Sequence, residues 1–176
     1  MVEDLWIFGY GSLIWKPDIP FDERRVVRTR GWARRFWQGS HDHRGVPDAP
    51  GRVVTLIADA RAICDGVAFR VPAVEVESVL GGLDYREKNG YARHTLTLEP
   101  QDGEPFEGLV YIATPDNEAF LGDASAAAIA LQIVKSRGPS GPNIEYLLNL
   151  AAALRDIGAH DPHVFELETL VMTMTR

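Results

Sequence analysis

The chain has 176 residues, of which 45% are hydrophobic and 24% charged, and its formal net charge is −7. This composition is that of one ordinary globular domain over residues 1–176, long enough to bury a hydrophobic core. A net negative charge without runs of like charge argues against nucleic acid as a partner, and no apolar run approaches the ~18–20 residues needed to cross a membrane.

The first predicted strand, 5–8, ends in a turn that contains two glycines. Its aromatic and β-branched residues are typical of a buried strand, and Gly9, Tyr10 and Gly11 follow it. Glycine permits positive φ and a close approach of a ligand to the main chain, so that several N–H groups can converge on one anion. With the hydroxyl of Ser12 added, the turn predicts a cradle for a small carboxylate. The alternative is a plain tight turn after an edge strand.

Two other functions of a glycine turn fit this sequence less well. A dinucleotide-binding loop needs a third glycine where Ile14 stands, and no Gly-Lys-Ser/Thr follows for a phosphate-binding loop. A serine hydrolase would need the G-x-S-x-G elbow, which the residues around Ser12 do not form.

The remaining elements follow from hydrophobic spacing and turn chemistry. In chain order, strands are predicted over 24–38, 52–58, 63–71, 92–99 and 106–113, and helices over 72–85, 124–134, 144–154 and 164–174. The segment at 24–38 is one long strand or a pair of strands, bent near Gly31. The next two strands form a hairpin across 59–61, and Asp123 caps the helix at 124–134. Strands followed mostly by helices predict the α+β class, with a curved or closed antiparallel sheet and a helical C-terminal third.

Cys64 is the only cysteine, so no disulfide can form within the chain. We expect a buried structural thiol rather than a nucleophile, since it lies in an apolar stretch. One cysteine, and an N-terminus without a basic secretory signal, favour the reducing cytoplasm.

Glu87 is the candidate catalytic carboxylate. It lies in a charged run between Arg86 and Lys88, at the end of the predicted helix and just before Gly90 and Tyr91. A solvated helix end explains such a run equally well. Beside a substrate amine, however, the carboxylate could act as a general base, and burial would bring its pKa of about 4.3 closer to the amine's pKa of about 8.

The polar loop at 39–51 lies between strands, where functional residues are often found. Its His41 and His43 have the spacing of a metal-binding pair on a strand, but no third ligand converges on them in sequence, so no metal is expected. Several arginines flank the loop: Arg34, Arg35, Arg44 and Arg52. They form surface ion pairs or recognise a substrate carboxylate, for which the guanidinium is well suited.

Four separated stretches together resemble the motifs of the ChaC-type γ-glutamylcyclotransferases, over nearly the whole chain. They are G-Y-G-S-L-I-W at 9–15; R-R-F-W-Q-G-S at 34–40, continued by 42–45 and 50–56; D-Y-R-E-K-N-G-Y at 84–91; and G-P-S-G-P-N at 138–143 with E-Y-L at 145–147. The resemblance implies a small, mostly antiparallel barrel surrounded by helices. It also implies cleavage of glutathione to 5-oxoproline and Cys-Gly, with Glu87 as general acid/base.

The same resemblance implies that residues 7–12 hold the γ-glutamyl group and that Tyr146 lines the pocket. The full set of predicted substrate-binding residues is Ile7, Phe8, Gly9, Tyr10, Gly11, Ser12, Leu13, Arg44, Arg52, Tyr91 and Tyr146. No cofactor is expected, because the nucleophile is the substrate's own amine, and no obligate protein partner is expected. Two alternatives stay open: a cyclotransferase for other γ-glutamyl amides, and a binding module without catalysis.

Overall fold

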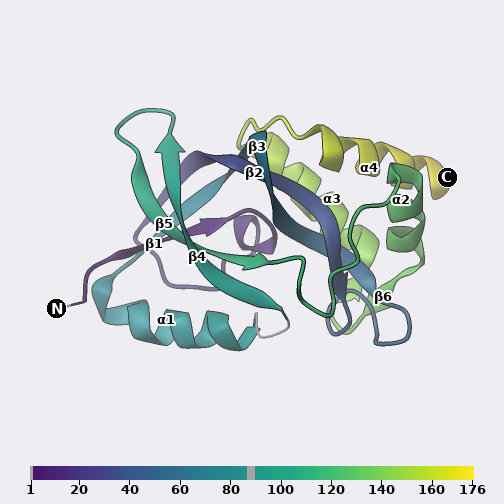
Figure 1. Cartoon of the computed structure of the whole chain (residues 1–176), viewed down its shortest axis with the longest axis horizontal. Coiled ribbons are helices and arrows are strands. Elements are labelled where there is room, and N and C mark those ends of the chain that lie inside the picture. The colour runs from purple at the N-terminus through teal and green to yellow at the C-terminus, as the bar shows by residue number, and fades with distance from the viewer. Residues whose placement is uncertain (1, 87–89) are drawn as a thin grey trace.

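The computed structural model describes residues 2–86 and 90–176 (Figure 1). The strands are β1 (Leu5–Gly9), β2 (Glu23–Ser40), β3 (Gly51–Val71), β4 (Tyr91–Pro100), β5 (Phe106–Ala113), β6 (Arg137–Gly138) and β7 (Gly141–Pro142). The helices are the 3₁₀ turn η1 (Ser12–Ile14), α1 (Ala73–Arg86), α2 (Ala126–Lys135), α3 (Asn143–Asp156) and α4 (Pro162–Met174). The predicted α+β class with a helical C-terminal third is confirmed.

Five strands close into a barrel in the order β1-β3-β2-β4-β5. Every neighbouring pair is antiparallel except β1 and β5, which run parallel where Ile7 faces Leu109. The prediction of a closed, mostly antiparallel barrel is therefore confirmed. Closure brings β5, which is late in the sequence, next to the N-terminal strand and its glycine turn.

One prediction about the strands is wrong, because β3 is a single continuous strand and not a hairpin turned at 59–61. These residues lie opposite Gly31 of β2, where φ is +87° and the register between the two strands shifts. The backbone N–H of Arg61 donates to the Asp59 carboxylate over 3.0 Å. Turn-forming residues here produce a bulge that bends both long strands around the barrel, rather than a chain reversal.

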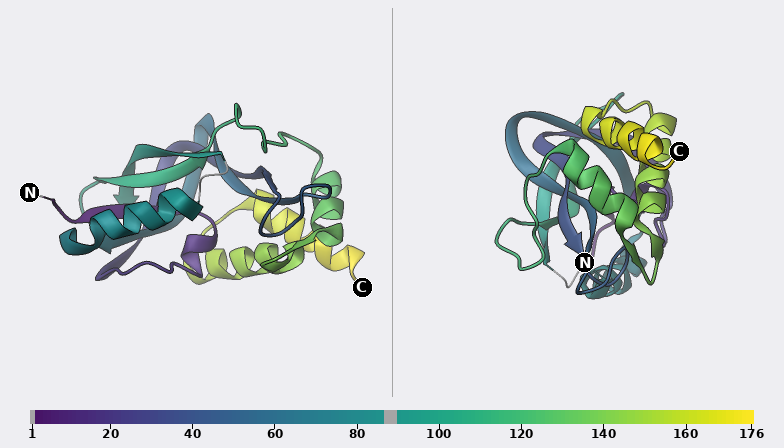
Figure 2. Two further views of the ribbon diagram at one scale, coloured as in Figure 1. Left: turned by 90° about the horizontal axis from the view of Figure 1, so that it is seen from below. Right: turned by 90° about the vertical axis from the view of Figure 1, so that its right-hand side faces the viewer.

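The helices lie on two sides of the barrel, with α1 on one side and α2, α3 and α4 grouped on the other (Figure 2). Helix α1 buries Val76, Val79 and Leu83 against Ile7 and Val71 of the barrel. Within the described ranges, no helix is both long and apolar enough to cross a membrane.

The N-cap predicted for helix α2 is wrong by two residues. Ser125, not Asp123, caps the helix, since its hydroxyl accepts the backbone N–H of Ala128 over 3.1 Å. Both residue types are good N-caps, so the sequence alone did not separate them.

Candidate active site

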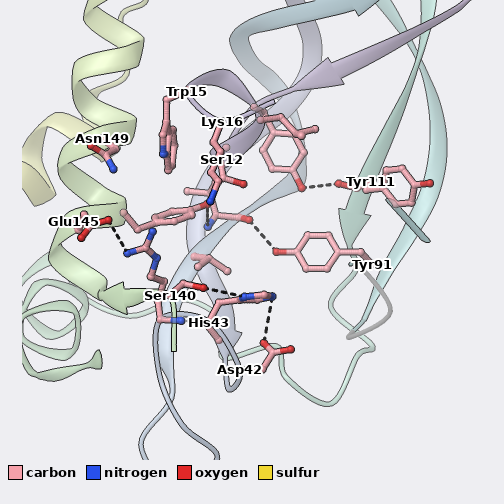
Figure 3. Close-up of a pocket in the computed structure, with 18 of the residues that line it drawn as sticks. Ser12, Trp15, Lys16, Asp42, His43, Tyr91, Tyr111, Ser140, Glu145 and Asn149 are labelled. Carbon is pink, nitrogen blue, oxygen red and sulfur yellow. Dashed lines mark hydrogen bonds and ion pairs between the residues drawn. The ribbon is translucent and has the colours of Figure 1, made fainter. Parts of the chain in front are cut away.

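A pocket of about 510 Å³ opens where the turn after β1, the last turns of α1, the loop after β2 and the start of α3 meet (Figure 3). Its lining is Phe8, Tyr10, Gly11, Ser12, Leu13, Trp15, Lys16, Gly39, Ser40, Asp42, His43, Arg44, Val53, Val54, Leu83, Tyr91, Tyr111, Ser140, Glu145, Tyr146 and Asn149. The lining mixes aromatic rings with charged groups of both signs, which suits a small zwitterionic ligand.

The turn after β1 is held by main-chain and side-chain hydrogen bonds. The Gly11 carbonyl accepts the N–H of Ile14 over 3.0 Å, and the Ser12 carbonyl accepts the N–H of Lys16 over 2.8 Å. The Tyr10 hydroxyl donates to the backbone carbonyl of Tyr111 over 2.6 Å. This last bond ties the glycine turn to strand β5, so the turn is fixed to the barrel wall.

The positive φ expected for the two glycines of the turn is wrong, since neither Gly9 nor Gly11 has one. A Cβ on Gly11 would lie 3.0 Å from both the Tyr146 hydroxyl and a Val54 methyl group. Glycine is needed here because three segments pack closely together, and not because of an unusual backbone conformation.

Arg34 supports the turn from behind, although it was predicted to lie on the surface or to bind substrate. Its side chain is buried, and its Nε donates to the Tyr10 carbonyl over 2.7 Å. Its Nη1 pairs with the Asp161 carboxylate at 2.6 Å, and its Nη2 donates to the Asp65 carbonyl. Arg34 therefore joins the turn, strand β3 and the N-terminus of α4.

Tyr91, from strand β4, and Tyr146, from helix α3, both line the pocket and form hydrogen bonds with the same residue of β3. The Tyr91 hydroxyl donates to the Val54 carbonyl over 3.2 Å, and the Val54 N–H donates to the Tyr146 hydroxyl over 3.3 Å. The Tyr146 ring also meets Trp15 edge to face, with 5.2 Å between ring centroids. Both tyrosines were predicted at the site, and the structure brings them to the pocket.

The loop after β2 contributes to the pocket, as predicted. The Arg44 Nη1 donates to the Pro142 carbonyl over 3.1 Å and lies 3.5 Å from a Glu145 carboxylate oxygen. The His43 Nδ1 is 3.3 Å from the Ser140 hydroxyl, and its Nε2 is 3.9 Å from Asp42 (Figure 3). These contacts join the loop to the β6–β7 turn and to helix α3.

An ion-pair network lies at the end of α1, beside the pocket. The Tyr111 hydroxyl donates to the Asp84 carboxylate over 2.7 Å, and the Arg93 Nε donates to the same oxygen over 2.9 Å. The bonds from Arg93 and then from Tyr111 lower the pKa of Asp84. Burial and the Asp84 carboxylate raise the pKa of Tyr111, so its hydroxyl stays protonated and serves as a donor. This network fixes the end of α1 to strands β4 and β5.

In a comparison with known proteins, residues 5–174 match the family model of the ChaC-like proteins. The chain belongs to the ChaC-like family. It is 46% identical to glutathione-specific gamma-glutamylcyclotransferase 1 of Homo sapiens, over 97% of this chain and 79% of that protein. It is also 46% identical to gamma-glutamylcyclotransferase 2-3 of Arabidopsis thaliana, over 95% of this chain and 88% of that protein.

A solved structure has the same fold as this ChaC-like chain. It is a crystal structure of a yeast γ-glutamyl cyclotransferase described as specific to glutathione, with a TM-score of 0.93 and 31% identity. The likeness covers 97% of this chain and 96% of the yeast chain.

Some predicted residues of the ChaC-like site do not line the pocket. Ile7 is buried in the core beneath α1, and Gly9 packs against Leu13. Arg52 donates from Nε to the Gln132 side chain over 2.7 Å and from Nη1 to the Phe36 carbonyl over 2.9 Å. The guanidinium of Arg52 is thus used to join helix α2 to the barrel. Glu87 lies outside the described residues.

Several pocket residues were not predicted. Trp15 and Lys16 continue the glycine turn, and Ser140 and Glu145 belong to the C-terminal motif, so each lies next to a recognised stretch. Tyr111 lies in an ordinary strand, and only closure of the barrel brings it to the site.

Cys64 was predicted to be a buried structural thiol, and no metal was expected at His41 and His43. Cys64 is buried as predicted, and burial raises the pKa of its thiol to about 11, which leaves it protonated. Within residues 2–86 and 90–176, no three His, Cys, Asp or Glu side chains group closely enough to hold a metal ion. Accordingly, His43 contacts Asp42 and Ser140 rather than a set of metal ligands.

Proposed function

We propose that the protein is a γ-glutamylcyclotransferase that cleaves glutathione to 5-oxoproline and Cys-Gly. Its relatives in Homo sapiens and yeast are named or described as specific for glutathione. The fold and the extent of the match support the same activity here, because the pocket residues fall within the matched range.

One observation supports Glu87 as the general acid/base more than any other. Leu83, four residues before it, and Tyr91, four residues after it, line the same pocket as Tyr10, Gly11 and Ser12. The described residues on both sides of Glu87 in the sequence thus lie at this pocket, together with the turn proposed to hold the γ-glutamyl group.

The proposed reaction is an intramolecular acyl transfer. Glu87 takes a proton from the α-ammonium group of the γ-glutamyl unit, and the freed amine attacks its own γ-carbonyl carbon. The tetrahedral intermediate then collapses: the ring nitrogen gives up a second proton, the bond to the cysteinyl nitrogen breaks, and the departing nitrogen takes up two protons, the first of which Glu87 returns and the second of which comes from solvent. The products are 5-oxoproline and Cys-Gly. Because the ring closes within one molecule, the protein mainly has to hold the chain folded and to assist proton transfer from the attacking to the departing nitrogen.

The glycine turn has the groups needed to bind an anion. A helix leaves its first N–H groups without partners inside the helix, and η1 begins at Ser12 on the pocket lining. We infer that backbone N–H groups near residues 10–13 bind the α-carboxylate or stabilise the oxyanion of the intermediate. Tyr91, Tyr146 and Arg44 complete the proposed binding surface.

The proposal extends to the setting in which the protein works. We propose a single domain that acts in the cytoplasm on a small molecule, without a nucleic acid, a membrane or an obligate protein partner. The lone, buried Cys64 and a thiol substrate both suit a reducing compartment.

The direct test is to incubate the purified chain with glutathione and to measure the products. We expect 5-oxoproline and Cys-Gly in equal amounts, and no free glutamate. N-acetyl-glutathione, whose α-amine is blocked, should not be cleaved. Release of glutamate, or cleavage of the acetylated substrate, would mean hydrolysis and would overturn the proposal. Slower turnover of γ-Glu-Ala than of glutathione would separate this activity from a general cyclotransferase for γ-glutamyl amides.

A further inference from the structure

Most charged side chains around the pocket have a partner of opposite sign. Arg44 is mostly buried, and its guanidinium lies between the Pro142 carbonyl and the Glu145 carboxylate. It also lies over the Tyr146 ring, 5.9 Å from the centroid. The positive charge of Arg44 is thus already compensated within the protein, and its donors are partly used.

Lys16 differs from Arg44 in this respect. It lines the pocket, is exposed to solvent, and is fixed at its backbone by the bond from its N–H to the Ser12 carbonyl. In the part of the chain that the structure describes, no carboxylate lies within ion-pair distance of its ammonium group. Figure 3 shows Lys16 next to Ser12 and Trp15, across the pocket from Tyr91 and Tyr111. Lys16 thus presents to the pocket a positive charge that no described carboxylate pairs with, on the side away from the end of α1.

The substrate's charges indicate what this cation binds. In glutathione, the α-ammonium and α-carboxylate belong to the γ-glutamyl end, for which Glu87 and the glycine turn are the proposed partners. The glycine carboxylate at the other end remains, and an ammonium group is a suitable partner for it. We propose that Lys16 binds the glycine carboxylate and thereby selects glutathione over γ-glutamyl compounds that lack this charge. This inference rests on the function proposed above.

The test compares two substrates that differ only at this charge, glutathione and its glycine monoethyl ester. We expect the wild-type chain to have a kcat/KM for glutathione about tenfold above that for the ester, as is typical for one hydrogen bond to a charged group. Lys16→Met should lose this preference, because its kcat/KM falls for glutathione and stays nearly unchanged for the ester. Lys16→Arg should keep the preference. Lys135→Met, which removes an exposed lysine outside the pocket lining, serves as the matched control.

Each other outcome has a defined meaning. If Lys16→Met loses the same factor on both substrates, Lys16 acts at the γ-glutamyl end, and the inference is overturned. An unchanged preference in Lys16→Met overturns it as well, while production of 5-oxoproline by the wild type leaves the proposed function intact. If the wild-type chain releases 5-oxoproline from neither substrate, the proposed function and this inference both fall.

Discussion

An ion pair stabilises each side of the pocket, and the two pairs differ in how far they are exposed to solvent. Behind the glycine turn, the Arg34 side chain is 1% exposed and the Asp161 side chain 12%. At the end of α1, Arg93 and Asp84 are each 44% exposed. Breaking a buried pair leaves an uncompensated charge and is costly, whereas an exposed pair contributes little to stability. We therefore expect the ion pair behind the glycine turn to matter more for the stability of the fold than the bonds at the end of α1.

The largest effect is expected from Arg34→Met. This change removes the Arg34 hydrogen bonds to the Asp161 carboxylate and to the Tyr10 and Asp65 carbonyls and leaves the Asp161 charge uncompensated by Arg34, so the free energy of unfolding should fall by about 3–5 kcal/mol. Urea unfolding measures this loss. As a control, Arg155→Met breaks the exposed pair with Glu168 and should cost less than about 1 kcal/mol.

If Arg34→Met does not fold, Asp161→Asn keeps the test quantitative. Asparagine retains the N-cap acceptor for the Val164 N–H but removes the charge, and we expect a loss of about 1–3 kcal/mol. If Asp161→Asn lowers the free energy of unfolding no more than Arg155→Met does, the predicted difference between buried and exposed ion pairs is contradicted.

The second prediction concerns pH and His163, on the same side of the pocket as Arg34. Its Nε2 accepts the Phe36 N–H over 3.0 Å, and burial lowers its pKa from the ordinary 6.5 to about 4. Between these values the unfolded chain binds a proton that the folded chain does not, so stability rises with pH. As the pH falls from 6.5 to 4, His163 should therefore cost up to about 3 kcal/mol.

Melting temperatures across this pH range test the His163 prediction. His163→Gln can place an amide oxygen near the position of Nε2 as an acceptor for the Phe36 N–H but cannot titrate, so its melting temperature should fall less steeply than that of the wild type. Equal slopes in the two proteins would show that His163 does not control this dependence.

The smallest effect on stability is expected from Tyr111→Phe, which removes the bond to Asp84 at the end of α1. The free energy of unfolding should fall by only about 1 kcal/mol. Because the end of α1 leads directly to Glu87, we expect kcat to fall by about tenfold through loss of alignment. Steady-state assays with glutathione measure this, and Arg155→Met should keep the wild-type kcat. If kcat is unchanged in Tyr111→Phe, the network does not position the segment that carries the proposed general acid/base.

The sequence predicted the parts of the site whose signals are local. Tyr10, Ser12, Tyr91 and Tyr146 lie in recognisable stretches, and all four reach the pocket. The role of a buried residue whose partner lies far away in the sequence could not be predicted from local motifs. Arg34 has the same local pattern as a surface arginine, and only Asp161, far along the chain, makes it a core residue.

Two wrong predictions show that the same local sequence is compatible with more than one structure. The residues at 59–61 have the composition of a turn, yet the same residues form a bulge because β2 continues as their partner on the other side of the bend. Arg52 lies in a motif next to the pocket, but its side chain points to acceptors on Phe36, Gly122 and Gln132. Both outcomes depend on which segment lies opposite, and that information is not local in sequence.

The most direct test of the account is the turnover of glutathione by Glu87→Gln, compared with Glu77→Gln, which changes an exposed acid on helix α1 outside the pocket lining. Both variants should melt like the wild type, since glutamine differs from glutamate by one small group. We predict that Glu87→Gln lowers kcat for 5-oxoproline formation by about 10²–10⁴-fold, while Glu77→Gln keeps the wild-type rate. A folded Glu87→Gln variant with wild-type kcat would contradict the account.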